Sequence, residues 1–233
     1  MDKAGQRVSV VLLTYDRVGE LTRSLDKLLA MPEQQPVIVF DNTSADATAF
    51  VVAQRYPRVQ CISLPRNIGG AGRNAGVRLA ATPHVAFCDD DSWWEDGALG
   101  LAVEILDDYP AAAALCGRVL LGEDCREDPT CAGMAASPLP LEELPGPALL
   151  GFIACAAVFR RDAYLQAGGY EARFFVGGEE ALLTLDLAAA GWRIAYVPQL
   201  TVHHHPSPHR DNIARQKACR SGRGLVEEGH RGG

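Results

Sequence analysis

The order of apolar segments in the first ninety residues constrains the fold of this chain more than any other feature. Four short runs rich in β-branched and apolar residues are typical of strands buried on both faces. They span residues 8–13, 37–40, 59–64 and 84–88. Segments with apolar residues at helical spacing separate them, at 19–31, 45–56 and 70–81. Alternation of strand and helix predicts an α/β domain with a mainly parallel sheet. Ligands of such sheets bind at the carboxyl ends of the strands.

The second half of the chain alternates less regularly. We expect further helices at 99–109, 161–167 and 179–190, and strands at 111–121, 152–160 and 193–197. Residues 122–147 are rich in proline, glycine and acids and predict one long loop. After residue 218 the chain has no periodic apolar pattern, so we expect a single domain over 1–217 and a disordered Gly/Arg-rich tail over 218–233.

Composition excludes several classes of protein. The 233 residues carry a net charge of −7, whereas a protein that binds nucleic acid normally has a basic surface. No stretch reaches the roughly 18 apolar residues of a transmembrane helix, and the N-terminus does not resemble a signal peptide. Seven cysteines without C-x-x-C spacing suggest neither disulfides nor zinc, and a structural role is favoured even for Cys125 and Cys131. We therefore expect a cytoplasmic protein.

Three adjacent carboxylates, Asp89-Asp90-Asp91, follow the fourth strand directly. Their mutual repulsion must be offset, and Mg²⁺ or Mn²⁺ with its preference for oxygen ligands would do so. An acidic triplet is also common in solvated turns. Its place at the carboxyl end of a strand favours the metal site.

A glycine-rich segment at 67–76 follows the third strand. Glycine permits close approach of the backbone, helix N-termini attract phosphate, and Arg73 could pair with a diphosphate. The spacing G-x-G-x-x-x-G after the third strand disfavours a dinucleotide-binding site. Packing of a helix on the sheet explains the glycines equally well, and the two roles are compatible.

Asp41 ends the second strand, where its carboxylate can accept hydrogen bonds from a ribose or a base. Ser44 and Asp46, which follow it, are typical helix caps.

Glu179 and Glu180 begin a predicted helix, where carboxylates favour the helix dipole and where mutual repulsion can raise one pKa as a general base requires. The histidines at 203–205 increase the expectation of a metal or substrate contact.

Taken in this order, the segments from about Val8 to Ser207 resemble family 2 glycosyltransferases, the inverting enzymes of the GT-A fold. Residues 8–17 resemble the opening strand and its T-Y-N-R turn, with Asp16 in place of Asn. Residues 39–46 are similar to V-D-N-x-S-x-D, residues 67–74 to N-x-G-x-x-x-x-R-N, and residues 87–91 to the D-x-D motif. The resemblance implies a GT-A (Rossmann-like) α/β/α sandwich with a mainly parallel central sheet.

The same resemblance implies roles for individual residues on the donor side. Asp41 would contact the nucleotide base, Arg73 would lie near the diphosphate, and Asp89 with Asp91 would form the metal pair. The whole set expected to bind the donor nucleotide is Thr14, Tyr15, Arg17, Asp41, Asn67, Gly70, Arg73, Asp89 and Asp90.

Downstream, residues 157–161 and 168–171 resemble the run F-R-R…G-G-F-D-E on the acceptor side of the family. Glu180 occupies the position of the catalytic base, where the family has Asp, so Glu179 remains an alternative. Residues 198–204 resemble the strand that precedes the C-terminal metal-ligand histidine. Alternation along that strand then selects His204.

The resemblance predicts transfer of a sugar from a nucleotide-diphosphate sugar to a hydroxyl of a glycan or lipid-linked acceptor, with Mg²⁺ or Mn²⁺ as cofactor. Contact with the inner face of a membrane would be peripheral. Two alternatives remain open. A sugar-1-phosphate nucleotidyltransferase is disfavoured because residues 12–19 lack lysine, and a non-catalytic nucleotide-sugar binder is suggested by Glu180 and the unusual tail.

Overall fold

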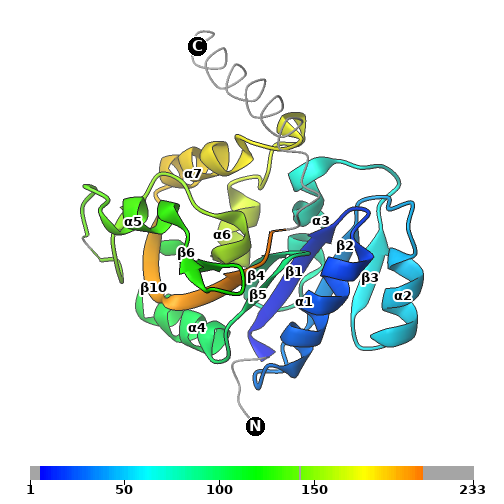
Figure 1. The fold of residues 1–233 in the computed structure, drawn as a ribbon. Helices are drawn as coiled ribbons and strands as arrows, with labels where there is room; N and C mark the ends of the chain where they lie inside the picture. The colour runs from blue at the N-terminus through cyan, green and yellow to red at the C-terminus, as the bar shows by residue number, and fades with distance from the viewer. Residues whose placement is uncertain (1–5, 142, 207–233) are drawn as a thin grey trace.

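The computed structural model describes residues 6–141 and 143–206, which form one curved sheet with helices on both faces (Figure 1). Within this part the sheet has ten strands, eight of them in the order β3-β2-β1-β4-β9-β6-β10-β5, with β7 paired to β6 and β8 to β10. The strands are β1 (Val8–Thr14), β2 (Val37–Asp41), β3 (Gln60–Ser63), β4 (His84–Asp89), β5 (Ser92–Trp94), β6 (Ala112–Leu121), β7 (Arg126–Glu127), β8 (Ala148–Leu149), β9 (Ala157–Arg160) and β10 (Arg193–His204). The helices are α1 (Val18–Ala30), α2 (Thr48–Arg55), α3 (Gly72–Leu79), α4 (Ala98–Asp108), α5 (Pro129–Ala135), α6 (Arg161–Gln166) and α7 (Glu179–Ala189).

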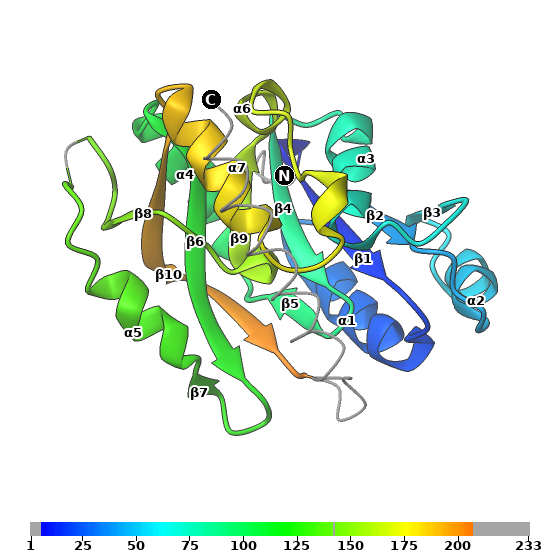
Figure 2. The same cartoon turned by 90° about the horizontal axis from the view of Figure 1, so that it is seen from above.

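The first half of the sheet confirms the α/β prediction. Strands β3, β2, β1 and β4 pair in parallel, and the strands of this half are connected through α1, α2 and α3. Helix α3 covers one face of the sheet, while α1 and α2 cover the other (Figure 2). The carboxyl ends of β1, β2 and β4 therefore meet at one edge of the sheet.

The second half of the sheet contains both parallel and antiparallel strand pairs. Strand β9 runs antiparallel between β4 and β6, and β10 pairs in parallel with β6 but antiparallel with β5 and β8. The longest registers are parallel, so the sheet is mostly parallel, as predicted. Strand β10 extends well beyond the predicted end at Val197, because pairing with β6 resumes at Thr201 after an irregularity that contains Pro198.

Two local predictions were wrong, and one strand was missed. The loop expected over 122–147 contains β7 and α5, and α5 begins with Pro129 after Asp128, whose carboxylate accepts the N–H of Thr130 at 2.8 Å. The strand expected over 152–160 begins only at Ala157, after a 3₁₀ turn. The three-residue strand β5 was not predicted, since so short a run carries little periodic signal.

The N-cap position of α2 is Ala47, which has no side-chain cap, so neither Ser44 nor Asp46 is the predicted N-cap. Asp46 accepts the N–H of Thr48 at 2.9 Å and also the N–H of Val18 at 3.1 Å, so it joins the starts of α1 and α2. The hydroxyl of Ser44 instead accepts the N–H of Asp16 at 2.9 Å.

The cysteines behave as core residues, as expected. All six in the described part of the chain are free, and four of them, Cys88, Cys116, Cys131 and Cys155, are buried. Burial raises the pKa of the Cys88 and Cys116 thiols to about 12, which keeps them protonated and unreactive.

The tail predicted at 218–233, and the domain end at 217, lie outside the described residues. No helix of residues 6–141 and 143–206 is long and apolar enough to cross a membrane.

Gly76 lets α3 lie against β1. A Cβ at this position would overlap Cγ1 of Val11 and would lie 3.2 Å from Cε2 of Phe40, and both side chains are fixed in the core. The packing explanation for this glycine therefore holds.

We predict that Gly76→Ala lowers the free energy of unfolding by roughly 1–3 kcal/mol, because overpacking outweighs the gain of about 1 kcal/mol in helix propensity. The matched control is Gly19→Ala in α1, where an added Cβ meets no atom within 4 Å. The control should be neutral or slightly stabilising in urea unfolding. Equal stability of the two variants would contradict this account of the packing.

Candidate active site

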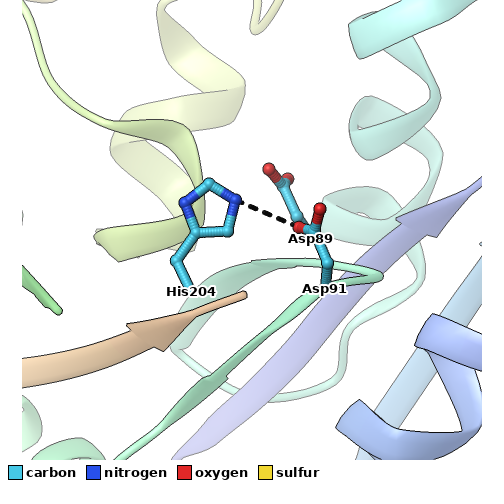
Figure 3. Close-up of side chains that lie close together, drawn as sticks. All are labelled: Asp89, Asp91 and His204. Atoms are coloured by element: carbon cyan, nitrogen blue, oxygen red, sulfur yellow. Dashed lines mark ion pairs between the residues drawn. The ribbon is translucent and has the colours of Figure 1, made fainter. Parts of the chain in front are cut away.

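Asp89, Asp91 and His204 come together at the carboxyl edge of the sheet. Asp89 ends β4, Asp91 lies in the turn to β5, and His204 ends β10, which pairs with β5 in antiparallel register. Figure 3 shows the imidazole of His204 directed at the two carboxylates, with Nε2 at 3.1 Å from Oδ1 of Asp91. One ligand atom from each of the three residues lies within 4.8 Å of the others.

The acidic triplet is buried rather than solvated. Asp91 is fully buried and Asp90 is 6% exposed, which excludes the solvated acidic turn considered from the sequence. Burial raises the pKa of Asp90 to about 7, and the neighbouring carboxylates add to this while Arg17 opposes it. The hydroxyl of Thr14 donates to Asp90 at 3.0 Å.

Two arginines from different elements neutralise the triplet. Arg17, just before α1, lies 3.2 Å from a carboxylate oxygen of Asp90 and 3.5 Å from one of Asp91. Arg73, in the first turn of α3, forms an ion pair with Asp89. Burial disfavours the charge of Arg73, but the attraction of Asp89 outweighs it and raises the pKa of the guanidinium.

These three groups suit a divalent cation. Two carboxylates and one imidazole form a mixed oxygen and nitrogen donor set, which Mn²⁺ and Mg²⁺ accept. The alternation predicted along the last strand is also seen. His203 and His205 lie against the ring of Trp93, at 5.6 and 4.6 Å between ring centroids, and only His204 is brought to the carboxylates.

Hydrogen bonds to other residues of the chain fix the glycine-rich turn. The N–H of Gly70 donates to the carbonyl of Phe175 at 2.7 Å, and Asn67 accepts the N–H of Gly69 at 3.0 Å. Asn42, which sequence reasoning missed, donates to the carbonyl of Gly69 at 3.2 Å and accepts the N–H of Ile68 at 3.0 Å. The N–H of Gly70 therefore already has a partner within the chain, and of this segment Arg73 is the group that reaches the acidic triplet.

The remaining donor-side residues lie around the same edge. Asp41 is 3% exposed, and its carboxylate accepts the N–H of Ser44 at 2.9 Å and the hydroxyl of Ser63 at 3.1 Å. Tyr15 follows β1 and is 48% exposed, so its ring is available to a ligand. Asp41 is thus fixed in orientation, whereas Tyr15 is accessible.

Glu179 and Glu180 differ in environment although they are adjacent. Burial raises the pKa of Glu180 to about 7, with a further increase from the charge of Glu179, while Arg73 opposes the shift. Glu179 packs on the glycine turn, since a Cβ at Gly70 would lie 2.7 Å from its Oε1. Gly178, with φ of +108°, precedes both and sets the start of α7.

Asn74 is a second residue with several hydrogen bonds that the site prediction omitted. Its Oδ1 accepts the hydroxyl of Tyr164 at 2.6 Å and the N–H of Tyr170 at 2.8 Å, and its Nδ2 donates to the carbonyl of Tyr170 at 2.7 Å. It joins α3 to the segment that leads to α7. The sequence signal that could have identified Asn74 was its position directly after Arg73.

The comparisons with known proteins identify the family of the chain. A family model described as Glycosyl transferase family 2 matches residues 9–167, more than half of the chain. The chain therefore belongs to glycosyltransferase family 2, as the motif order predicted. This finding replaces the nucleotidyltransferase hypothesis.

Curated relatives carry related names. An N-acetylglucosaminyl-diphospho-decaprenol L-rhamnosyltransferase of Mycobacterium tuberculosis is 29% identical over 84% of this chain and 75% of its own length. The succinoglycan biosynthesis protein ExoO of Rhizobium meliloti is 29% identical over 85% of this chain and 60% of its own.

Solved structures show the GT-A glycosyltransferase fold. S. aureus TarS in complex with UDP-GlcNAc has a TM-score of 0.71 at 18% identity, and the mannosyltransferase PcManGT of Pyrobaculum calidifontis, with GDP-Man and Mn²⁺, has 0.70 at 22%. The matches cover 88% and 97% of this chain, which in turn spans 60% and 65% of the solved chains.

Proposed function

We propose that this glycosyltransferase moves a sugar from a nucleotide-diphosphate sugar to an acceptor hydroxyl, with inversion at the anomeric carbon and with help from a divalent cation. One observation carries the proposal. The cluster of Asp89, Asp91 and His204 lies at the sheet edge that also carries Arg73. The positive charge of Arg73 acts on Glu180, a carboxylate whose pKa is raised by burial. The proposed metal ligands, the arginine that would bind phosphate and the proposed base are thus assigned to one edge of the sheet.

Asp91 and His204 would hold the cation together with Asp89. When bound, Mn²⁺ or Mg²⁺ neutralises the charge that develops on the departing diphosphate. Similarity to PcManGT, whose structure contains GDP-Man and Mn²⁺, supports this assignment.

The arginines would bind the diphosphate of the donor. Arg17 and Arg73 are paired with the acidic triplet, and both guanidinium groups can turn part of their donors toward phosphate oxygens. Thr14, Tyr15, Asn67 and Asp41 would complete the nucleotide site, with Tyr15 lying against the base or ribose. The N–H of Gly70 has a protein partner, so its contribution would be the close backbone approach.

Glu180 would act as the general base. A carboxylate with a pKa near 7 can accept the proton of an acceptor hydroxyl at neutral pH. The hydroxyl oxygen then bonds to the anomeric carbon from the face opposite the diphosphate, the bond to the diphosphate breaks, and the configuration inverts. Glu179, packed on Gly70, would position the start of α7 and raise the pKa of Glu180.

The acceptor is proposed to be a glycan or a lipid-linked sugar. The names of the rhamnosyltransferase and of the succinoglycan protein support this class. A location in the cytoplasm, with peripheral contact at the inner face of the membrane, fits such an acceptor. The alternative of a non-catalytic nucleotide-sugar binder predicts binding without turnover.

We expect one nucleotide sugar of a panel to release its nucleoside diphosphate slowly without an acceptor, in the presence of Mn²⁺ or Mg²⁺ but not of EDTA. Asp91→Asn should reduce this release more than about 100-fold, because it removes a charged metal ligand. The control is Asp96→Asn, which changes an exposed carboxylate of the next turn. Tight binding without release under any condition, with candidate acceptors supplied, would favour the non-catalytic binder.

The pH dependence tests the base. The rate should rise with pH through a limb near pH 7 as Glu180 loses its proton. Glu179→Gln removes a negative neighbour, which lowers the pKa of Glu180, so the limb should move to lower pH. Kinetics of kcat/KM between pH 5 and 9 measure this, with Glu104→Gln, at an exposed position of α4, as control. A limb that stays in place or moves to higher pH in Glu179→Gln would exclude Glu180 as the base.

A further inference from the structure

Phe175 combines a strained backbone with an exposed aromatic ring. Its φ is +56° and its ψ is −68°, a region that residues with a side chain rarely adopt, and the residue is 48% exposed. Both features oppose stability. Glycine would relieve the strain and remove the apolar surface, and the same segment uses glycine at Gly177 and Gly178, where φ is also positive.

The backbone of Phe175 is fixed by its surroundings. Its carbonyl accepts the N–H of Gly70 at 2.7 Å, and a Cβ at Gly69 would overlap that carbonyl oxygen. The preceding ring, Phe174, is buried and lies against Gly178, where an added Cβ would approach it to 2.9 Å. These contacts determine the direction in which the side chain of Phe175 leaves the chain.

The position of this residue connects the two sides of the proposed site. The yellow segment before α7 lies between α7 and α3 (Figure 2). Phe175 contacts the glycine turn that precedes Arg73, and Glu179 packs on the same turn at Gly70. The backbone of Phe175 therefore lies on the same glycine turn as Glu179, the neighbour of the proposed base, and the residue is 48% exposed.

We propose that the ring of Phe175 is a binding platform for a pyranose ring of the acceptor. The inference rests on the proposed function and names the part of the acceptor that the site recognises. A phenyl face has no hydrogen-bonding group, so it suits the apolar C–H face of a sugar, and binding would remove the exposed aromatic surface from water. A rigid backbone at this position presents the ring in one orientation and so reduces the ordering required on binding.

Two other roles for an exposed ring at this place give different outcomes. A ring that contacts the donor sugar would change the KM of the nucleotide sugar. A ring that inserts into a membrane would change binding to vesicles. The acceptor platform predicts no change in either property.

The test uses the whole chain with the variants Phe175→Ala, Phe175→Leu and Phe175→Tyr. The matched control is Phe50→Ala, which removes a phenyl group that is more exposed (69%) from α2, away from the glycine turn. Release of nucleoside diphosphate without an acceptor is measured first, because it reports the proposed function alone. Binding of methyl glycosides of glucose, galactose, mannose, rhamnose and N-acetylglucosamine is then measured by saturation-transfer NMR, with nucleoside diphosphate and Mn²⁺ present.

We expect at least one glycoside to bind the wild-type protein, and Phe175→Ala and Phe175→Leu to weaken that binding roughly tenfold. Phe175→Tyr and Phe50→Ala should keep it. Donor release, donor KM and binding to vesicles of phosphatidylglycerol and phosphatidylethanolamine should be the same in all variants. The melting temperature of Phe175→Ala should fall only slightly, because about half of the residue is already exposed to solvent.

The proposal is overturned if no glycoside of the panel binds the wild-type protein, or if Phe175→Ala binds it as tightly as the wild type does. A raised donor KM in Phe175→Ala assigns the ring to the donor, and a loss of vesicle binding assigns it to a membrane. Absence of donor release in the wild-type protein contradicts the proposed function instead, and is seen independently of glycoside binding.

Discussion

The compensation of the buried carboxylates after β4 is the interaction on which the rest of this structure depends. Burying an ion costs several kcal/mol unless charge and hydrogen bonds offset it. Here the offsetting groups are Arg17 before α1, Arg73 in α3 and His204 at the end of β10. Segments far apart in the sequence are thereby drawn to one sheet edge. In the proposed function these carboxylates would bind a cation, and the arginines would bind the diphosphate, so the structural requirement and the proposed chemistry share the same groups.

A second set of contacts joins the glycine-rich turn on the proposed donor side to the start of α7, which carries the proposed base Glu180. Asn42 holds the glycine turn, Gly70 bonds to Phe175, and Glu179 packs on Gly70 at the start of α7. Asn74 binds the segment that leads to that helix. The glycines therefore serve mainly to bring α3, β1 and α7 close together. The edge that carries the proposed cation site and the helix that carries the proposed base are consequently held together.

Much of this arrangement follows from the sequence. Continuous apolar runs that alternate with segments of helical spacing predicted β1 to β4 and the helices between them. Because the carboxyl ends of parallel strands share one edge, Asp41, Arg73 and Asp89 to Asp91 were expected to gather there. Alternation along the last strand separated His204 from its neighbours. The remainder depends on contacts between distant segments. Helix α5, strand β5 and the long end of β10 have weak local signals, and the bond between Gly70 and Phe175 has none. Asn42 and Asn74 likewise carry no local sequence signal, because their hydrogen-bond partners lie in distant segments.

The central claim is that Asp89, Asp91 and His204 form the cation site at which a nucleotide diphosphate binds. The most direct test is a crystal of the protein with Mn²⁺ and a nucleoside diphosphate, with diffraction recorded at the manganese absorption edge. The account predicts a strong anomalous peak within bonding distance of a carboxylate oxygen of Asp91 and of Nε2 of His204, next to the diphosphate. A peak elsewhere, or a bound diphosphate remote from these three residues, would contradict it.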